Sequence, residues 1–157
     1  MIPMLVRCLI ASVAGMSAAA VSGPASRVVL DEVVGYGYSY STAAFVTNEE
    51  TNRAWVEAAV HNGGMGDDYS LETFRVKVPD LSYDTRTQEV LYDNQGSRVV
   101  CARVTVSKFL FTTRTRVTST GHCELLTRLE RRKDDNGFEY ETSKHLVVEL
   151  SITPQQP

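Results

Sequence analysis

Residues 123–152 read CELLTRLERRKDDNGFEYETSKHLVVELSI, and this stretch predicts two β-strands joined by a tight turn. Apolar residues alternate with polar ones on both sides of the turn, which is typical of strands with one face in a core. The dipeptide Asn136-Gly137 favours a two-residue type I′ turn, because both central residues of that turn need positive φ. We therefore predict an antiparallel hairpin at this end of the chain.

The predicted turn also sets the register of the hairpin. It places Leu125 opposite Val148 and leaves one face of both strands mostly apolar. A slip of one residue would exchange the two faces, so the match between the apolar faces supports this register. One pair is unfavourable, because Glu124 faces Glu149 across the strands.

Alternation of apolar and polar residues predicts further strands upstream of this hairpin. These cover residues 74–78, 81–84, 89–92, 99–106 and 109–117, and residues 27–45 are extended with glycine interruptions. The turns between them are short, and no long helix is expected. About eight strands joined in this way predict an all-β fold, an antiparallel meander that forms a barrel or a sandwich.

Residues 47–61 fit two patterns. Thr47 and Glu50 have the spacing of a helix capping box, and the alanines that follow have helical spacing. Alanine and valine also alternate with polar residues from Arg53 onward, as in a strand. We favour the strand and leave the helix as the alternative.

Residues 1–20 have the layout of a secretory signal peptide. Arg7 precedes an apolar run, and the small residues Ala18 and Ala20 form a cleavage site of the A-x-A type. A retained membrane anchor is the weaker alternative, because the run is short and rich in Ala, Gly and Ser. We expect a periplasmic or secreted protein with no stable membrane span after cleavage.

Cleavage leaves a single β-rich domain, residues 21–153, with a frayed tail at residues 154–157. Cys8 leaves with the signal peptide, and an even pair in an exported chain predicts a disulfide between Cys101 and Cys123. A free thiol pair and a metal pair are the alternatives. By simple alternation Cys101 points away from the core, so the bridge requires a bulge, a sheet edge or a strand buried on both sides.

Aromatic residues supply the first candidate binding site. Tyr36, Tyr38 and Tyr40 lie at alternating positions and form one stripe on a strand. Such a stripe is either a platform for sugar rings or an apolar ligand, or a core stripe whose hydroxyls reach the rim. Trp55 is either an exposed binding anchor or a packed core residue.

Charge supplies the second candidate. The net charge of −3 gives no basic excess and does not indicate nucleic acid. Residues 21–94 carry 5 basic and 12 acidic side chains, whereas residues 95–157 carry 10 basic and 7 acidic ones. Five basic residues in an acid-free stretch form a candidate patch for an acidic partner, a polyanion or lipid headgroups: Arg98, Arg103, Lys108, Arg114 and Arg116. Pairing with the acidic half inside one sheet is the simpler interpretation.

Catalytic motifs do not stand out in the sequence. The three histidines are scattered, and no nucleophile elbow, phosphate loop or dinucleotide fingerprint occurs. We expect no cofactor and no metal. The leading hypothesis is a non-enzymatic binding module for a protein or cell-envelope partner. A small-ligand carrier with Tyr36, Tyr38 and Tyr40 inside a barrel is the alternative, and an unrecognised hydrolase is the third hypothesis.

Overall fold

The computed structural model describes residues 23–34, 38–63 and 69–153. The predicted signal peptide, Tyr36 and the tail at residues 154–157 lie outside these ranges. The described residues form strands and turns only, so none of them belongs to a helix that could cross a membrane. The strands are β1 (Pro24–Val34), β2 (Tyr38–Asn48), β3 (Arg53–Gly63), β4 (Tyr69–Val76), β5 (Leu81–Asp84), β6 (Glu89–Asn94), β7 (Ser97–Phe109), β8 (Thr112–Ser119), β9 (Cys123–Lys133) and β10 (Glu139–Ile152).

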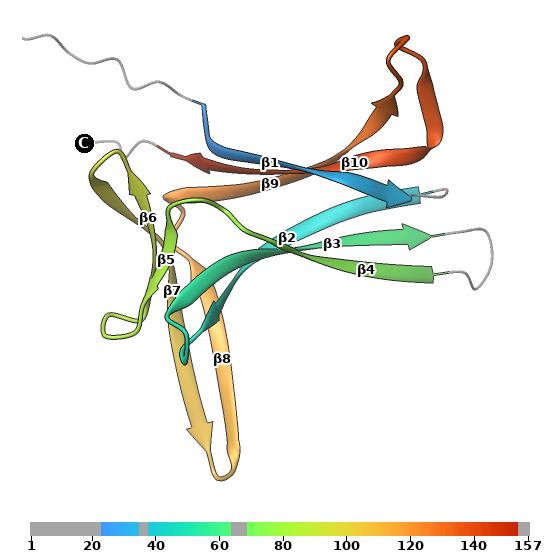
Figure 1. Ribbon diagram of the computed structural model, residues 1–157. Helices are drawn as coiled ribbons and strands as arrows, with labels where there is room; N and C mark the ends of the chain where they lie inside the picture. Colours follow the sequence, from blue (N-terminus) through green and yellow to red (C-terminus); the bar gives the residue numbers. More distant parts are fainter. Residues whose placement is uncertain (1–22, 35–37, 64–68, 154–157) are drawn as a thin grey trace, which may run out of the picture.

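The strands form three antiparallel sheets in the orders β1-β10-β9, β2-β3-β4 and β5-β6-β7-β8. Strands that follow each other in sequence pair within each sheet, and the first strand also pairs with the last. Figure 1 shows the two three-stranded sheets extending to one side, with the β7–β8 ribbon running away from both. The all-β antiparallel prediction is confirmed. The described strands number ten rather than about eight, partly because residues 27–45 divide into β1 and β2.

One hydrophobic core joins the three sheets. It is built mainly from valine and other small or branched side chains, which pack well on pleated strands. The largest fully buried side chains are Leu146, Leu150, Val33, Val56, Val60, Val76, Val90, Val147, Val148 and Cys101. The Tyr92 hydroxyl donates a hydrogen bond to the Ala25 carbonyl oxygen at 3.1 Å, which links the four-stranded sheet to β1.

Residues 47–61 form the end of β2, a turn and most of β3, so the strand prediction from Arg53 is confirmed. The capping-box spacing marks a turn instead of a helix. The Thr51 backbone N–H donates to the Asn48 side-chain oxygen at 3.0 Å, and Asn52 adopts a φ of 51°. Asparagine tolerates this left-handed conformation better than most residues.

The disulfide between Cys101 and Cys123 forms, with the two Cα atoms 4.8 Å apart, and it joins β7 to β9. The register between β6 and β7 shifts between Val90 and Leu91, so Cys101 is an extra residue without a partner on β6. Such a bulge turns a side chain away from simple alternation. The bulge therefore explains how Cys101 reaches the core.

The turn of the last hairpin differs from the prediction. The Gly137 N–H donates to the Asp134 carbonyl oxygen and the Asp134 N–H donates to the Phe138 carbonyl oxygen, both at 2.9 Å. Gly137 adopts a φ of +84°, while Asn136 is not at positive φ. The two-residue type I′ turn is wrong. The hairpin closes through a three-residue loop that ends in a left-handed glycine.

The register of this hairpin also differs, because β10 carries an irregularity between Tyr140 and Lys144. Leu125 therefore pairs with Leu150, two residues along from the predicted partner Val148. A shift of two residues leaves both faces unchanged. The predicted register is wrong, and the predicted apolar face is right.

In the observed register Glu149 does not face Glu124. Two arginines contact the Glu149 carboxylate instead. Arg128 donates to both carboxylate oxygens of Glu149 at 2.9 and 3.1 Å. Arg27 Nε lies 3.3 Å from the same carboxylate. The hydrogen bonds from Arg128 hold the pKa of the Glu149 carboxyl below its ordinary value of 4.5.

Glu149→Gln should reduce the acid sensitivity of the fold. A carboxyl whose pKa is lower in the folded state stabilises the fold above its unfolded pKa, and this contribution is lost as the pH falls through the folded pKa. The variant should therefore melt at a lower temperature than wild type at neutral pH, and the difference should shrink as the pH falls through the acid range. Thermal melts across this range test the effect.

Glu124→Gln is the matched control, because among the described residues Glu124 forms no ion pair. Its melting temperature should follow wild type across the pH range. A constant difference between Glu149→Gln and wild type at every pH would contradict the assignment.

Candidate binding surfaces

Aromatic side chains gather on the outer side of the β2-β3-β4 sheet. The register pairs Tyr40 with His61, and His61 with Leu71. Tyr69 pairs with Gly63, two residues along β3 from His61. Residues on one strand alternate between the two faces, so these side chains share the face opposite the core. We call this surface the aromatic face; its residues are Tyr38, Tyr40, His61, Tyr69 and Leu71.

The rings of the aromatic face hold one another in place. The Tyr40 and His61 rings stack with centroids 4.4 Å apart and planes 3° apart. The Tyr69 hydroxyl and His61 Nδ1 share a hydrogen bond at 2.5 Å. Tyr40 is nevertheless 58% exposed and Tyr38 is 92% exposed. The result is an accessible surface on which Tyr40 and His61 stack and the Tyr69 ring lies tilted by 46° against His61.

The stripe of tyrosines does not line an interior. Tyr38 and Tyr40 point outward, so both the core stripe and the tyrosine-lined barrel are wrong for these two residues. The small residues at the alternate positions Ser39, Ser41 and Ala43 face the core side instead. Tyr36 lies outside the described residues.

Trp55 is separate from the aromatic face, although it lies on the same side of β3. The Arg75 guanidinium covers its ring, with Cζ 3.8 Å from the ring centroid. This contact is a cation–π interaction. Trp55 is half-buried under this cover, so it contributes packing and is not an open anchor.

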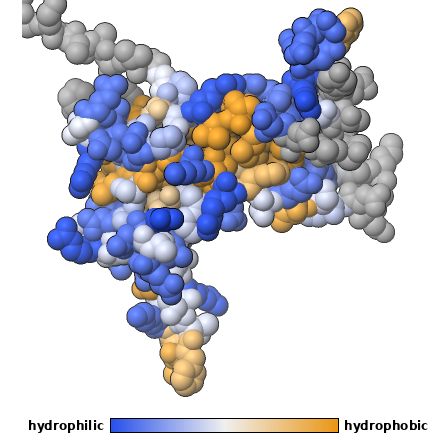
Figure 2. Space-filling model, viewed as in Figure 1, coloured by the Kyte–Doolittle hydropathy of each residue, from blue (hydrophilic) through white to orange (hydrophobic). Residues whose placement is uncertain are grey.

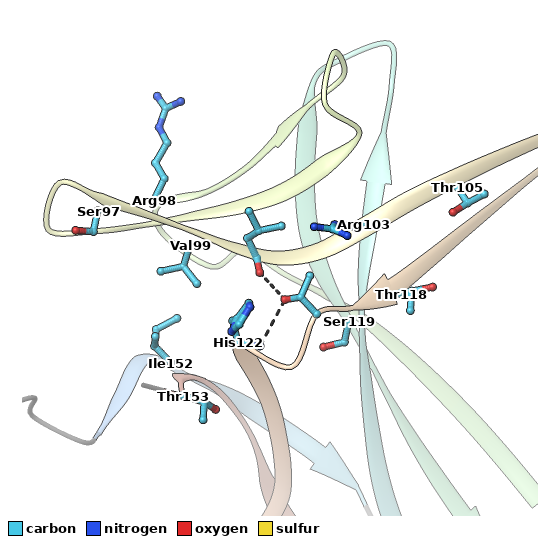
Figure 3. A pocket seen from close by; sticks show the side chains of 12 residues that line it. Ser97, Arg98, Val99, Arg103, Thr105, Thr118, Ser119, His122, Ile152 and Thr153 are labelled. Atoms are coloured by element: carbon cyan, nitrogen blue, oxygen red, sulfur yellow. Dashed lines mark hydrogen bonds between the residues drawn. The ribbon is translucent and has the colours of Figure 1, made fainter. Parts of the chain in front are cut away.

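Two of the five predicted basic residues line a groove of about 990 Å³, and these are Arg98 and Arg103. Figure 3 shows the groove between the β7–β8 strands and the chain around His122 and Thr153. Arg103 Nε lies 3.6 Å from a Glu89 carboxylate oxygen. The expected pairing with the acidic half is thus present at Arg103.

Arg98 lies near a second acidic group. Backbone N–H donors of Arg86 and Thr87 hold the pKa of Asp84 below its ordinary value of 3.8, and the nearby charges of Arg86 and Arg98 add to the effect.

The other three basic residues lie farther out on the β7–β8 ribbon. Arg114 pairs with Ser107 and Arg116 with Thr105, so both arginines share one face. Lys108 lies on the opposite face. The predicted patch is therefore one surface only in part: Arg103, Arg116 and Arg114 follow one another along one face of the ribbon, whereas Lys108 lies on the other face and Arg98 lies beyond the bulge at Cys101.

A second cavity of about 520 Å³ lies where β2, β8 and β9 meet. Phe45, Val117 and Leu125 are among its apolar lining residues. Its size is within the range of small-ligand sites. The tyrosines take no part in it.

Comparison with known proteins adds no relative. The chain matches no family model, and no curated protein and no solved structure is significantly similar to it. The surfaces are therefore interpreted from their own chemistry.

Two groups of surface residues escape prediction from the sequence. His61, Tyr69 and Leu71 join the tyrosines only through the β2-β3-β4 register, which links distant parts of the chain. The sequence predicts a strand that starts at Phe109, but residues 109–111, Phe-Leu-Phe, form the end of the β7–β8 ribbon. The sequence feature that marks this end of the ribbon is an apolar triplet inside a basic stretch without acidic residues.

Proposed function

We propose that this protein is an exported, non-enzymatic binding module that engages a component of the cell envelope, a protein or a glycan, through the aromatic face. The observation that supports the proposal is the exposed Tyr40–His61 stack on rigid paired strands. Contiguous exposed patches of large apolar side chains mark interaction sites, and tyrosine is enriched at binding hot spots.

The export part of the proposal rests on two features. The first twenty residues have the composition of a secretory leader. The structure contains a disulfide, and disulfides persist mainly in oxidising compartments outside the cytosol. A periplasmic or secreted location agrees with both.

Tyr40→Ala combined with Tyr69→Ala should weaken binding to isolated cell envelopes of the source organism by at least about tenfold, the typical effect of removing a hot-spot residue. Co-sedimentation of the purified protein measures the affinity. Envelopes treated with protease or with glycan-degrading enzymes show whether the partner is protein or glycan. Both tyrosines are largely exposed, so the variant should keep its melting temperature.

Phe138→Ala is the matched control, because Phe138 is an exposed aromatic residue on a different hairpin. It should bind as wild type does. Equal binding by wild type and the double tyrosine variant would refute the role of the aromatic face.

A small-ligand carrier is the second candidate function, and the cavity lined by Phe45, Val117 and Leu125 now supports it in place of the tyrosines. An apolar ligand in this cavity would contact β2, β8 and the start of β9, one strand from each of the three sheets. Binding of an apolar ligand to this cavity that is unchanged in the tyrosine double variant would favour this candidate.

A further inference from the structure

The β7–β8 ribbon leaves the body of the protein and ends in three exposed apolar residues. Val104 is still buried, and Leu110 at the turn lies about 20 Å farther on, at about 3.3 Å per strand residue. Phe109 is 75% exposed, Leu110 is 84% exposed and Phe111 is fully exposed. Figure 1 shows the projecting ribbon, and Figure 2 shows the apolar colour concentrated at its end. We call residues 109–111 the tip.

The turn at the tip contradicts ordinary turn chemistry. Phe109 pairs with Thr112, which leaves a two-residue loop, and Leu110 adopts a φ of 51°. Glycine or asparagine normally takes such a position, because a larger side chain is strained there. Gln95 takes the same position in the β6–β7 turn at a φ of 51°, but it is polar and is followed by Gly96, whereas Leu110 is apolar and is followed by Phe111. An exposed leucine in a strained conformation serves neither folding nor solubility, so the tip calls for a functional explanation.

Positive charge follows directly behind the tip on both faces of the ribbon. Lys108 lies on one face, and Arg114 and Arg116 lie on the other. Within the described part of the chain, none of the three forms an ion pair. No acidic residue occurs between Gln95 and Cys123. The charges are therefore available to an anionic partner.

We propose that the tip inserts into the surface of an anionic lipid bilayer while Lys108, Arg114 and Arg116 contact the lipid headgroups. The spacing fits this arrangement. Lys108 is level with Thr113, and Arg114 lies about 7 Å behind Thr112 at about 3.3 Å per residue, which is close to the thickness of one headgroup layer, roughly 5–7 Å. Arg116 lies about 13 Å behind Thr112, so its long side chain must extend toward the bilayer to place its guanidinium among the headgroups. Three apolar side chains at a convex end reach the boundary of the acyl chains without crossing the bilayer.

The arrangement of the cations favours a bilayer over a groove on a protein. A groove would contact one face of the ribbon, whereas here charge lies on both faces behind a convex apolar end. A planar anionic surface meets both faces at once. The proposal uses a surface different from the aromatic face, so it can fail or succeed independently of the proposed function.

Vesicle co-sedimentation of the purified protein tests the proposal. We expect binding to vesicles of phosphatidylcholine with phosphatidylglycerol, weaker binding to phosphatidylcholine alone, and loss of binding as salt shortens the screening length. Replacing Lys108, Arg114 and Arg116 together with glutamine should weaken binding to the anionic vesicles by about fivefold per charge.

The decisive variant combines Phe109→Thr, Leu110→Gly and Phe111→Asn. It should weaken vesicle binding at least about tenfold, since it removes the apolar groups that insert. Glycine followed by asparagine suits a tight turn with positive φ at its first central residue. The variant should therefore melt at or above the wild-type temperature, which separates lost insertion from lost folding.

A Phe111→Trp reporter and a Phe138→Ser control complete the test. The emission of the new tryptophan should shift to the blue when anionic vesicles are added, and Phe138→Ser should bind vesicles as wild type does. The proposal is overturned if the wild type binds no vesicles, or if the tip variant binds them equally well. A tip variant that changes only the oligomeric state would assign the tip to a second copy of the chain and would also overturn it.

Discussion

Leu146→Ala should lower the free energy of unfolding by about 3 kcal/mol, within the range for large-to-small changes in a core. Leu146 is fully buried in β10, the central strand of its sheet. It pairs with Leu30 on β1 and with Leu129 on β9. Truncation therefore opens a cavity that well-packed neighbours on both sides cannot fill. Urea denaturation followed by circular dichroism measures the loss.

Val29→Ala is the control for this prediction, because Val29 is on β1 but 40% exposed. Its cost should stay below about 1 kcal/mol, as expected for partial loss of burial. If Leu146→Ala costs no more than Val29→Ala, the position of the core in this sheet is incorrect.

Replacing Cys101 and Cys123 together with alanine should cost about 3 kcal/mol. The bridge closes a loop with a sequence separation of 22 residues, and cross-linking a loop of this length restricts the unfolded chain by about that amount. Both cysteines are buried, so the bridge also anchors the β7 bulge to the start of β9. Denaturation with and without reductant measures the effect.

The reductant provides the internal control for this pair. Wild type should lose about as much stability on reduction as the double alanine variant loses by substitution, and the variant should not respond to reductant. Intact mass after alkylation should show no free thiol at these two positions in the unreduced protein. A wild type that is equally stable in both conditions would contradict the prediction.

The turn residues show how far local sequence can mislead. Asn136-Gly137 indicated a two-residue turn, but the Asp134 side-chain oxygen accepts hydrogen bonds from the N–H groups of Asn136 and Phe138 at 3.0 and 2.8 Å. These bonds stabilise the longer loop. The irregularity in β10 then sets a register in which Glu149 meets Arg128 instead of Glu124. Contacts beyond the turn thus outweighed the preference of one dipeptide.

The faces of β2 show the same limit. Its alternation separates the tyrosines from Ser41, Ala43 and Phe45, but either side could face a core. Pairing with β3 decides the matter, because Ser41 lies opposite the buried Val60. The larger side chains are thereby left outside. Their exposure is what makes the aromatic face a candidate binding surface.

Local pattern was sufficient for the strands, because a period of two residues and β-branched side chains specify extended backbone without distant partners. Counting the cysteines that follow the predicted leader was sufficient to predict the disulfide. The inward face of β2, the division of the basic residues and the apolar turn at Leu110 required the folded molecule. The first two features depend on which residues pair across neighbouring strands, and the third depends on how far the β7–β8 ribbon extends from the core. Both are decided only when distant segments of the chain pack together.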